Sequence, residues 1–296
     1  MMDEKEKKTL IPDILIPLLF MCLHILAQAF GMLAVSLYLS FQKSAQGVVQ
    51  PDLLKDQLGE MVADPLKVSA MSFIAALILI PIYTSYLRSH RAKLPGVLEK
   101  QQLSGQQILR VIIAAFGVIG LVNLWMLLLQ GLSDKVPFFS VQLEEYDELI
   151  SSLTGDNLPL FWEILVTALL VPLSEELLFR GIALAHFRRS LPVALAVLLQ
   201  ALLFGLFHGN FVQTSYALIP GLVFAWAYIR SRNFLVPILM HSCFNLFGGV
   251  LSSYLESAGQ LVQGVFTVVI EASLFLSLIF VWQDIKARRQ QLKQDI

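Results

Sequence analysis

Eight long apolar stretches constrain this 296-residue chain more than any other feature of its sequence. A helix needs about 20 mostly apolar residues to cross the ~30 Å hydrocarbon core of a bilayer. Hydrophobic residues make up 56% of the chain and charged residues only 15%, whereas a soluble protein needs more polar surface to face water. The sequence therefore predicts an all-α polytopic membrane protein. It excludes a soluble enzyme, a disordered chain and a nucleic-acid binder. The stretches cover residues 12–40, 66–87, 107–130, 161–187, 191–208, 212–229, 234–253 and 262–283.

The first stretch has some features of a cleaved signal peptide. Lys5, Lys7 and Lys8 precede it, and the Ala-Gln-Ala sequence at 27–29 resembles a cleavage site. The apolar run continues to about Leu39, however, well past the end of an ordinary signal peptide. We therefore expect an uncleaved first membrane helix.

The charged residues predict how the chain is oriented. Most of the 21 lysines and arginines lie in the two terminal segments and in the loops after the second, fourth and sixth stretches. Because basic residues resist translocation, this side should be cytoplasmic, with both termini inside, as an even number of spans requires. The two long loops on the other side, 41–65 and 131–160, hold most of the acidic residues. We expect the second to be a solvated acidic loop rather than a surface helix or a partial lid.

Two carboxylates and an arginine interrupt the fourth stretch, where an ionisable group costs a few kcal/mol or more. Glu176 and Arg180 are four residues apart and can pair on one helix face. Glu175 lies about 100° around the helix from Glu176 and is left free to face a cavity, where a carboxylate can act as a general base or acid. A buried ion pair that locks helix packing would explain Glu176 and Arg180 but not Glu175. We therefore expect Glu175 to be catalytic and the pair to support it.

Two further helices carry polar side chains at four-residue spacing. Phe204 and His208 share a face at the end of the fifth stretch, but a lone histidine near a helix end is more often an interfacial residue than a ligand. His241 and Asn245 point the same way from the seventh stretch and could stabilise an oxyanion. Taken alone, the second pair is better explained by hydrogen bonding between helices.

The three motifs together are more specific than any one of them. Glu-Glu-x-x-x-Arg, Phe-x-x-x-His and His-x-x-x-Asn on successive apolar helices resemble the CAAX protease and bacteriocin-processing family, the type II CAAX prenyl endopeptidases, also called Abi. The resemblance covers about 160–250 and implies an intramembrane endopeptidase of a bacterial inner or plasma membrane. It suggests N-terminal helices and external loops in 1–160, a catalytic core in 161–253, and a last helix with a basic tail in 254–296.

The resemblance also implies roles for the motif residues. Glu175 and His208 would activate the attacking water, while His241 and Asn245 would form the oxyanion hole. Glu176, Arg180 and Phe204 would support the site. The substrate would be a membrane-associated peptide or protein, prenylated or not; membrane lipid is the other expected partner, and nucleic acid is not one.

A metal ion is the main alternative to this mechanism. Glu175, His208 and His241 could bind zinc with three protein ligands and one open position. The sequence contains no His-Glu-x-x-His motif, and we favour the metal-free mechanism, with no cofactor.

Two other functions stay open at this point. The same residues could form the proton relay of a transporter, or the chain could be a non-catalytic scaffold or immunity protein that binds a partner. Broken helices in both halves would favour a transporter, but Pro172, Pro220 and Pro237 have no clear counterpart in the N-terminal half. An endopeptidase also requires His208, near the external end of its stretch, to meet His241, about seven residues from the cytoplasmic end of another.

Overall fold

The computed structural model describes residues 4–45, 64–94, 97–99, 101–153 and 159–294, which form helices and contain no β-strand. This confirms the all-α fold. The elements are α1 (Glu4–Ala45), α3 (Pro65–Ser89), α4 (Gly105–Ser133), α5 (Pro137–Leu153), α6 (Leu160–Glu163), η1 (Ile164–Leu170), α7 (Val171–Glu176), η2 (Leu177–Ala183), α8 (Leu184–Ser190), α9 (Val193–Leu206), α10 (Phe211–Ser231), α11 (Leu235–Asn245), η3 (Leu246–Val250), α12 (Ser252–Ser257) and α13 (Gln260–Gln294).

Each predicted apolar stretch has a helical counterpart. Two of the counterparts, Val193–Leu206 and Leu235–Val250, are shorter apolar helices, and one is the unbroken helical run from Leu160 to Ser190. The other five are long and apolar enough to cross a membrane. The chain is therefore a polytopic membrane protein. Within the described residues these five are Leu10–Gln42, Pro65–Ser89, Gly105–Ser133, Phe211–Ser231 and Gln260–Gln283.

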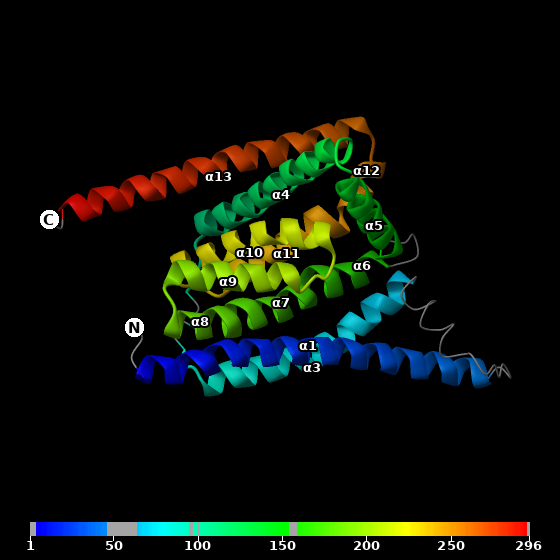
Figure 1. Ribbon diagram of the computed structural model, residues 1–296. Helices are drawn as coiled ribbons and strands as arrows, with labels where there is room; N and C mark the ends of the chain where they lie inside the picture. The colour runs from blue at the N-terminus through cyan, green and yellow to red at the C-terminus, as the bar shows by residue number, and fades with distance from the viewer. Residues whose placement is uncertain (1–3, 46–63, 95–96, 100, 154–158, 295–296) are drawn as a thin grey trace.

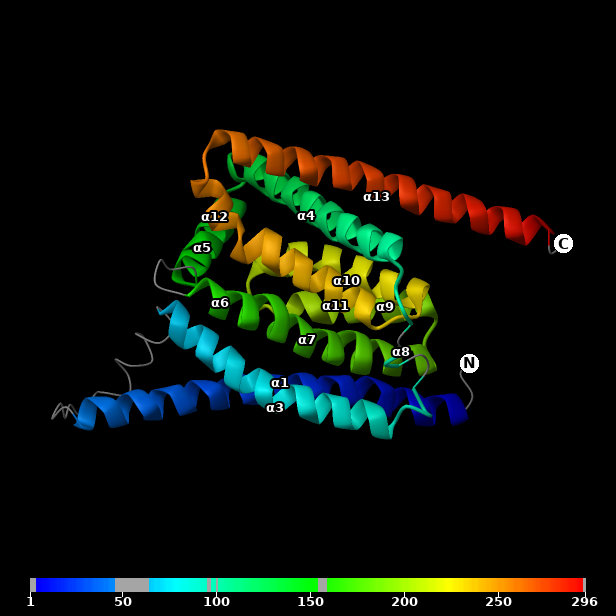
Figure 2. The ribbon, with the colours of Figure 1, turned by 180° about the vertical axis from the view of Figure 1, so that it is seen from behind.

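The helices form three layers (Figures 1 and 2). α1 and α3 pack together on one side, and α4 and α13 pack together on the opposite side. The run from α6 to α8, together with α9, α10 and α11, lies between these two pairs. The start of α1 and the end of α13 lie at the same end of the bundle, as an even number of spans requires. That this end is cytoplasmic stays a prediction.

The run from α6 to α8 contains two π-helical segments, η1 and η2, on either side of α7, and a third, η3, follows α11. Pro172 is the second residue of α7, just after η1, and proline lacks the backbone N–H that an α-helix would use at this position. A π-helical turn carries an extra residue and changes the direction in which the following side chains point. The two segments therefore set the orientation of α7, which carries the paired glutamates.

Glycines allow α9 and α10 to approach closely. A Cβ atom on Gly205 would lie 2.8 Å from the Thr214 carbonyl oxygen, and one on Gly221 would lie 3.1 Å from the Cβ of Ala201. Small residues at such contacts let the backbones of membrane helices pack closely. This packing places the end of α9 and the middle of α10 beside the buried polar residues of α7 and η2.

The acidic segment 131–160 is largely helical, so the predicted solvated loop is wrong. α5 begins at Pro137, a residue that favours the first turn of a helix, and places apolar side chains on the face that packs against α4 and α10. Phe138 packs edge-on against Phe211, with 5.0 Å between ring centroids. The acidic residues stay exposed, which makes α5 an amphipathic surface helix. Most of the other predicted loop, residues 46–63, lies outside the described residues.

Candidate active site

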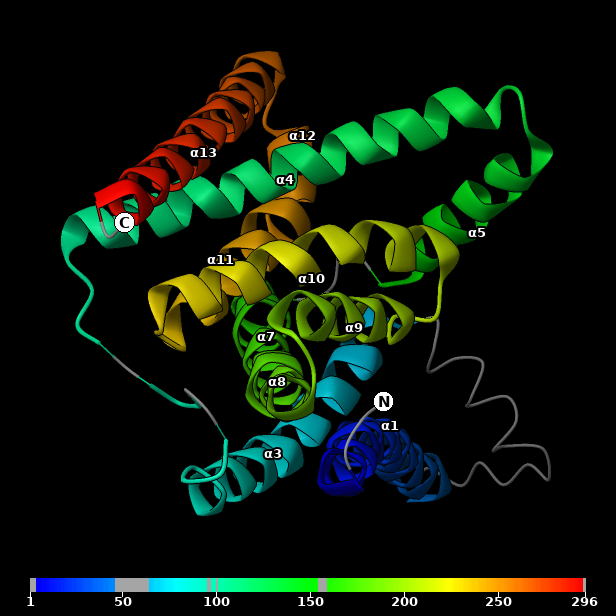
Figure 3. The same ribbon diagram turned by 60° about the vertical axis from the view of Figure 1, so that its left-hand side comes forward.

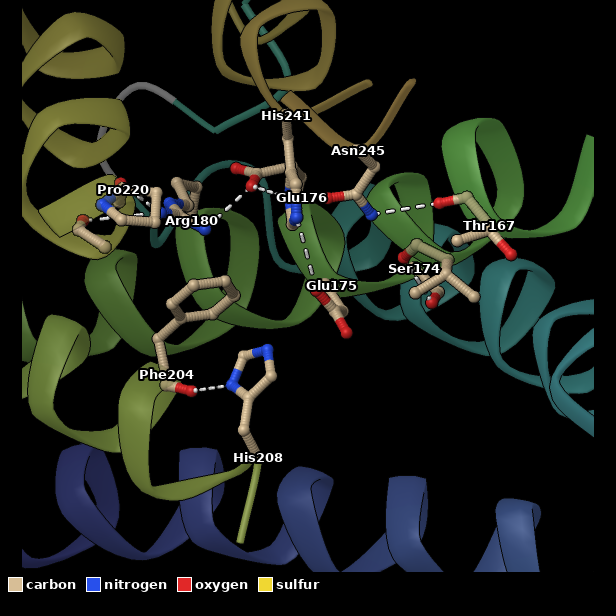
Figure 4. A network of polar contacts seen from close by, with 12 residues as sticks. Thr167, Ser174, Glu175, Glu176, Arg180, Phe204, His208, Pro220, His241 and Asn245 are labelled. Atoms are coloured by element: carbon tan, nitrogen blue, oxygen red, sulfur yellow. Dashed lines mark hydrogen bonds and ion pairs between the residues drawn. The ribbon is translucent and has the colours of Figure 1, made fainter. Parts of the chain in front are cut away.

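A buried ion pair lies at the centre of the middle layer (Figure 4). Arg180 Nη1 donates to Glu176 Oε1 at 2.7 Å, and both side chains are fully buried. Nη2 of Arg180 lies within hydrogen-bonding distance of the carbonyl oxygens of Pro220 and Gly221, at 3.2 and 3.3 Å. Such further hydrogen bonds offset part of the cost of burying the pair, although Glu176 Oε2 and Arg180 Nε have no partner among the described residues. The predicted pairing of Glu176 with Arg180 is confirmed. The bonds from Arg180 to the two carbonyl groups join η2 to α10.

Two aromatic rings cover the Arg180 guanidinium. Its central carbon lies 4.8 Å from the ring centroid of Phe204 and 5.5 Å from that of Phe224. Such cation–π contacts stabilise a cation more strongly when water is excluded. Phe204 also packs edge-on against His208 and His241, with centroid separations of 5.1 and 5.7 Å. The phenylalanine of the second motif therefore packs against Arg180 and against the rings of both histidines.

Glu175 differs from its neighbour in both exposure and contacts. Its side chain is 11% exposed, whereas that of Glu176 is fully buried. His241 Nε2 lies 3.6 Å from Glu175 Oε2, and the carboxylate accepts no hydrogen bond from any residue that the structure describes. Glu175 is thus the carboxylate of the pair that can still bind water or substrate.

The backbone fixes the tautomer of His208. Its Nδ1 lies 2.8 Å from the Phe204 carbonyl oxygen, which can only accept a hydrogen bond, so Nδ1 carries the proton. In the neutral ring, Nε2 then has a free lone pair. The side chain is half-buried, and Figure 4 shows its ring facing the same space as Glu175. His208 can therefore accept a proton at Nε2.

His241 and Asn245 both make contacts that limit their roles. His241 Nδ1 donates to Glu176 Oε1 at 2.8 Å, so its Nε2, beside Glu175, carries a proton only when the ring is a cation. Asn245 Nδ2 donates to the Thr167 carbonyl oxygen at 2.9 Å. An amide nitrogen has two hydrogens, so Asn245 keeps a second one for another acceptor.

The helix α9 is short, and His208, which follows it, and His241 both pack against Phe204. α9 has 14 residues, which span about 21 Å, well short of the ~30 Å hydrocarbon core. His208 lies in the turn that follows α9, where its side chain is half-buried and its ring packs against Phe204. The structure thus brings all three motifs together around Phe204.

The predicted zinc ligands do not form a metal site as they are placed. Among the described residues, no group of three or more His, Cys, Asp or Glu side chains could hold a metal ion. Glu175 and His241 are neighbours, and a hydrogen bond from the other ring nitrogen of His241 to a carboxylate is usual for zinc-binding histidines, so only the lack of a third donor among the described residues counts against the site. This donor set does not fit the three ligands and open position of a catalytic zinc.

The sequence analysis missed a second buried polar network, which joins α1, α3 and α8. Asp13 is buried in α1, with one carboxylate oxygen 2.8 Å from His186 Nδ1 and the other accepting from Ser190 Oγ at 2.6 Å. His186 Nε2 lies 2.8 Å from the Tyr86 hydroxyl. Asp13 is 173 residues from His186, so residue spacing could not have linked them. An acidic residue inside the first apolar stretch was the available signal.

The N-terminal helices also reach the surroundings of the site. His24 of α1 is buried and packs edge-on against Phe207, the neighbour of His208, at a centroid separation of 4.9 Å. The ring of Tyr83 of α3 also lies near His24, with 6.2 Å between the two ring centroids. No motif marks His24 or Tyr83 in the sequence, and only the packing of α1 and α3 against the middle layer places them here.

Comparison with known proteins identifies relatives of this site. The family described as "Type II CAAX prenyl endopeptidase Rce1-like" matches residues 157–247, which include all three motifs. "UPF0177 protein YxdF" of Lactococcus lactis is 32% identical over 127 residues, which are 39% of this chain and 68% of that protein. "Putative membrane peptidase YdiL" of Bacillus subtilis is 27% identical over 105 residues, which are 34% of this chain and 43% of that protein. No solved structure matches the chain.

Proposed function

Because the chain belongs to the type II CAAX prenyl endopeptidase Rce1-like family, we propose that it is an intramembrane endopeptidase that uses a water molecule activated by Glu175 and His208. The family match and the relative named as a membrane peptidase support a CAAX-type membrane protease, and the chain is an integral multi-pass membrane protein. Both relatives are bacterial, which supports a bacterial inner or plasma membrane as its location.

The difference between the two glutamates is the observation that carries this proposal. Glu176 is fully buried and is bonded to both Arg180 and His241 through one oxygen. Glu175 keeps an exposed part and no hydrogen bond within the described structure. A general base must be free to bind the water that it deprotonates. Glu175 meets this condition, and Glu176 instead orients His241.

The carboxylate of Glu175 and Nε2 of His208 are two free hydrogen-bond acceptors that can together activate a water molecule. A water molecule between Glu175 and His208 donates one hydrogen to the carboxylate and the other to Nε2 of His208, so its lone pair is directed at the substrate carbonyl. Glu175 takes the first proton as the oxygen–carbon bond forms, and His208 holds the remaining O–H. Glu175 then passes its proton to the leaving amine when the peptide bond breaks.

The oxyanion that forms on the substrate carbonyl needs donors. The second amide hydrogen of Asn245 is one, and Nε2 of His241 is another when that ring is cationic. Hydrogen-bond donors held in place before the reaction stabilise the transition state without reorganisation. The substrate is a peptide or protein in or near the membrane, and both prenylated CaaX peptides and unprenylated peptides are candidates.

Peptide cleavage by the purified full-length protein in detergent tests this proposal. A prenylated CaaX peptide and a panel of unprenylated peptides are incubated with the wild type, with Glu175→Gln and with Glu163→Gln. Glu163 is a half-buried glutamate of the same helical run that belongs to no motif, so it is the matched control. We expect cleavage by the wild type and the control and none by Glu175→Gln. Equal cleavage by all three would contradict the role of Glu175.

A second arm separates the two chemistries. The same assay is repeated with a strong zinc chelator, followed by addition of zinc. The metal-free mechanism predicts unchanged cleavage. Cleavage that is lost with the chelator and restored by zinc would overturn that mechanism while leaving proteolysis itself established.

A further inference from the structure

A cavity lies between α4, α10, α11 and α13, away from Glu175. Its volume is about 420 Å³, within the usual range for small-molecule sites. None of the catalytic candidates lines it. Val236 and Met240 line it from α11, so this helix carries the cavity on one face and His241 on another. Figure 3 shows α4 and α13 together on the opposite side of the bundle from α1 and α3.

Apart from Ser277, whose hydroxyl donates to backbone carbonyl groups, the hydrogen-bonding and charged side chains of this cavity are at one end. Gln107 and Arg110 come from the first two turns of α4, and Arg230 and Ser231 come from the end of α10. The Arg110 guanidinium lies 5.4 Å from the ring centroid of Phe280, which lines the same end of the cavity. This end is the one that the charge distribution predicts to be cytoplasmic.

The rest of the cavity is apolar and long. Val118, Leu121, Val223 and Leu274 line the deeper part. The 14 residues of α4 between Gln107 and Leu121 rise about 21 Å, because each helical residue adds ~1.5 Å. An acyl chain of one leaflet extends through about half of the ~30 Å hydrocarbon core, so it fits along this depth.

We propose that this cavity binds an anionic phospholipid of the cytoplasmic leaflet. The acyl chain occupies the apolar part, and the lipid phosphate lies between Arg110 and Arg230. Guanidinium groups bind phosphate oxygens through paired hydrogen bonds, and basic pockets between membrane helices on the cytoplasmic side bind acidic headgroups. A zwitterionic lipid would bring its own cation towards the two arginines, so the net negative charge of the headgroup decides which lipid binds.

Lipid retention by the purified full-length protein tests this site. The protein in detergent is mixed with phosphatidylglycerol or with phosphatidylcholine of identical acyl chains, and bound lipid is measured by native mass spectrometry. We expect the wild type to prefer phosphatidylglycerol. Arg110→Gln and Arg230→Gln should each weaken its binding about fivefold, and the double variant about 25-fold. Arg88→Gln, an exposed arginine at the end of α3 outside the cavity, is the matched control and should not change binding.

A variant that keeps both charges tests the apolar part. Ala227→Phe fills part of the cavity and should lower retention of phosphatidylglycerol, whereas the arginine variants remove the preference for its charge. Thermal unfolding of each variant shows whether it is folded. If an arginine variant does not fold, the retention of lipid by Ala227→Phe tests the proposal instead. Equal retention of the two lipids by the wild type, or unchanged retention by folded Ala227→Phe, would overturn the proposal.

Discussion

Replacing Arg180 with methionine should destabilise the protein more than any exposed charge substitution. Both members of the Arg180–Glu176 pair are fully buried, so the variant leaves a carboxylate without its cation in an environment that excludes water. Breaking a buried pair from one side typically costs about 3–5 kcal/mol. The carbonyl groups of Pro220 and Gly221 add little, because they belong to α10 and its backbone already bonds them. We therefore expect a loss of about 3–5 kcal/mol of unfolding free energy.

Removing both charges should restore much of this loss. In Arg180→Met with Glu176→Gln, the amide oxygen can still accept from His241 Nδ1, and no unpaired charge stays buried. The two substitutions should therefore be strongly non-additive, as for residues in direct contact. Unfolding is followed by tryptophan fluorescence during titration with a denaturing detergent, with the exposed Arg88→Met as the control. A loss below about 1 kcal/mol for Arg180→Met, or a double variant as unstable as the sum of its parts, would refute this reasoning.

Two further predictions test other parts of the structure. His208→Gln should lower kcat about 10²–10⁴-fold with little change in unfolding free energy, because among the described residues the half-buried ring hydrogen-bonds only to a backbone carbonyl; peptide cleavage with a kcat near that of the wild type would argue against its role. Asp13→Ala should cost about 1–3 kcal/mol, because it leaves His186 and Ser190 without their acceptor inside the bundle. The exposed Asp147→Ala is its control in the same unfolding titration, and equal stability of the two variants would contradict the proposed importance of the Asp13 network.

Interactions within one helix could be predicted from the sequence. The apolar stretches predicted the helices because their length is set by the thickness of the bilayer. The pairing of Glu176 with Arg180 followed from four-residue spacing alone. The amphipathic helix α5 was an alternative but not the preferred prediction, because its acidic residues are typical of a solvated loop. The apolar residues between them form the face that packs against the bundle.

Interactions between helices could not be predicted in the same way. The bond from His241 to Glu176 joins residues 65 apart, and only the packing of α11 against α7 creates it. The π-helical segments η1 and η2 depend on how the chain satisfies its backbone around Pro172, which no residue pattern specifies. The site residues could therefore be identified as a set, but their hydrogen-bond partners could not.

The short α9 has a consequence for hydration. A helix that ends inside the bilayer exposes backbone polar groups at a depth where hydrocarbon cannot satisfy them, so such a turn is stable only next to water or other protein groups. The Asn210 side chain satisfies two of these backbone groups by accepting hydrogen bonds from the Val212 and Gln213 amides, while Gly209 stays exposed. Each peptide bond that a hydrolase cleaves consumes a water molecule. We therefore expect water around the turn after α9, on the side of the site that carries His208.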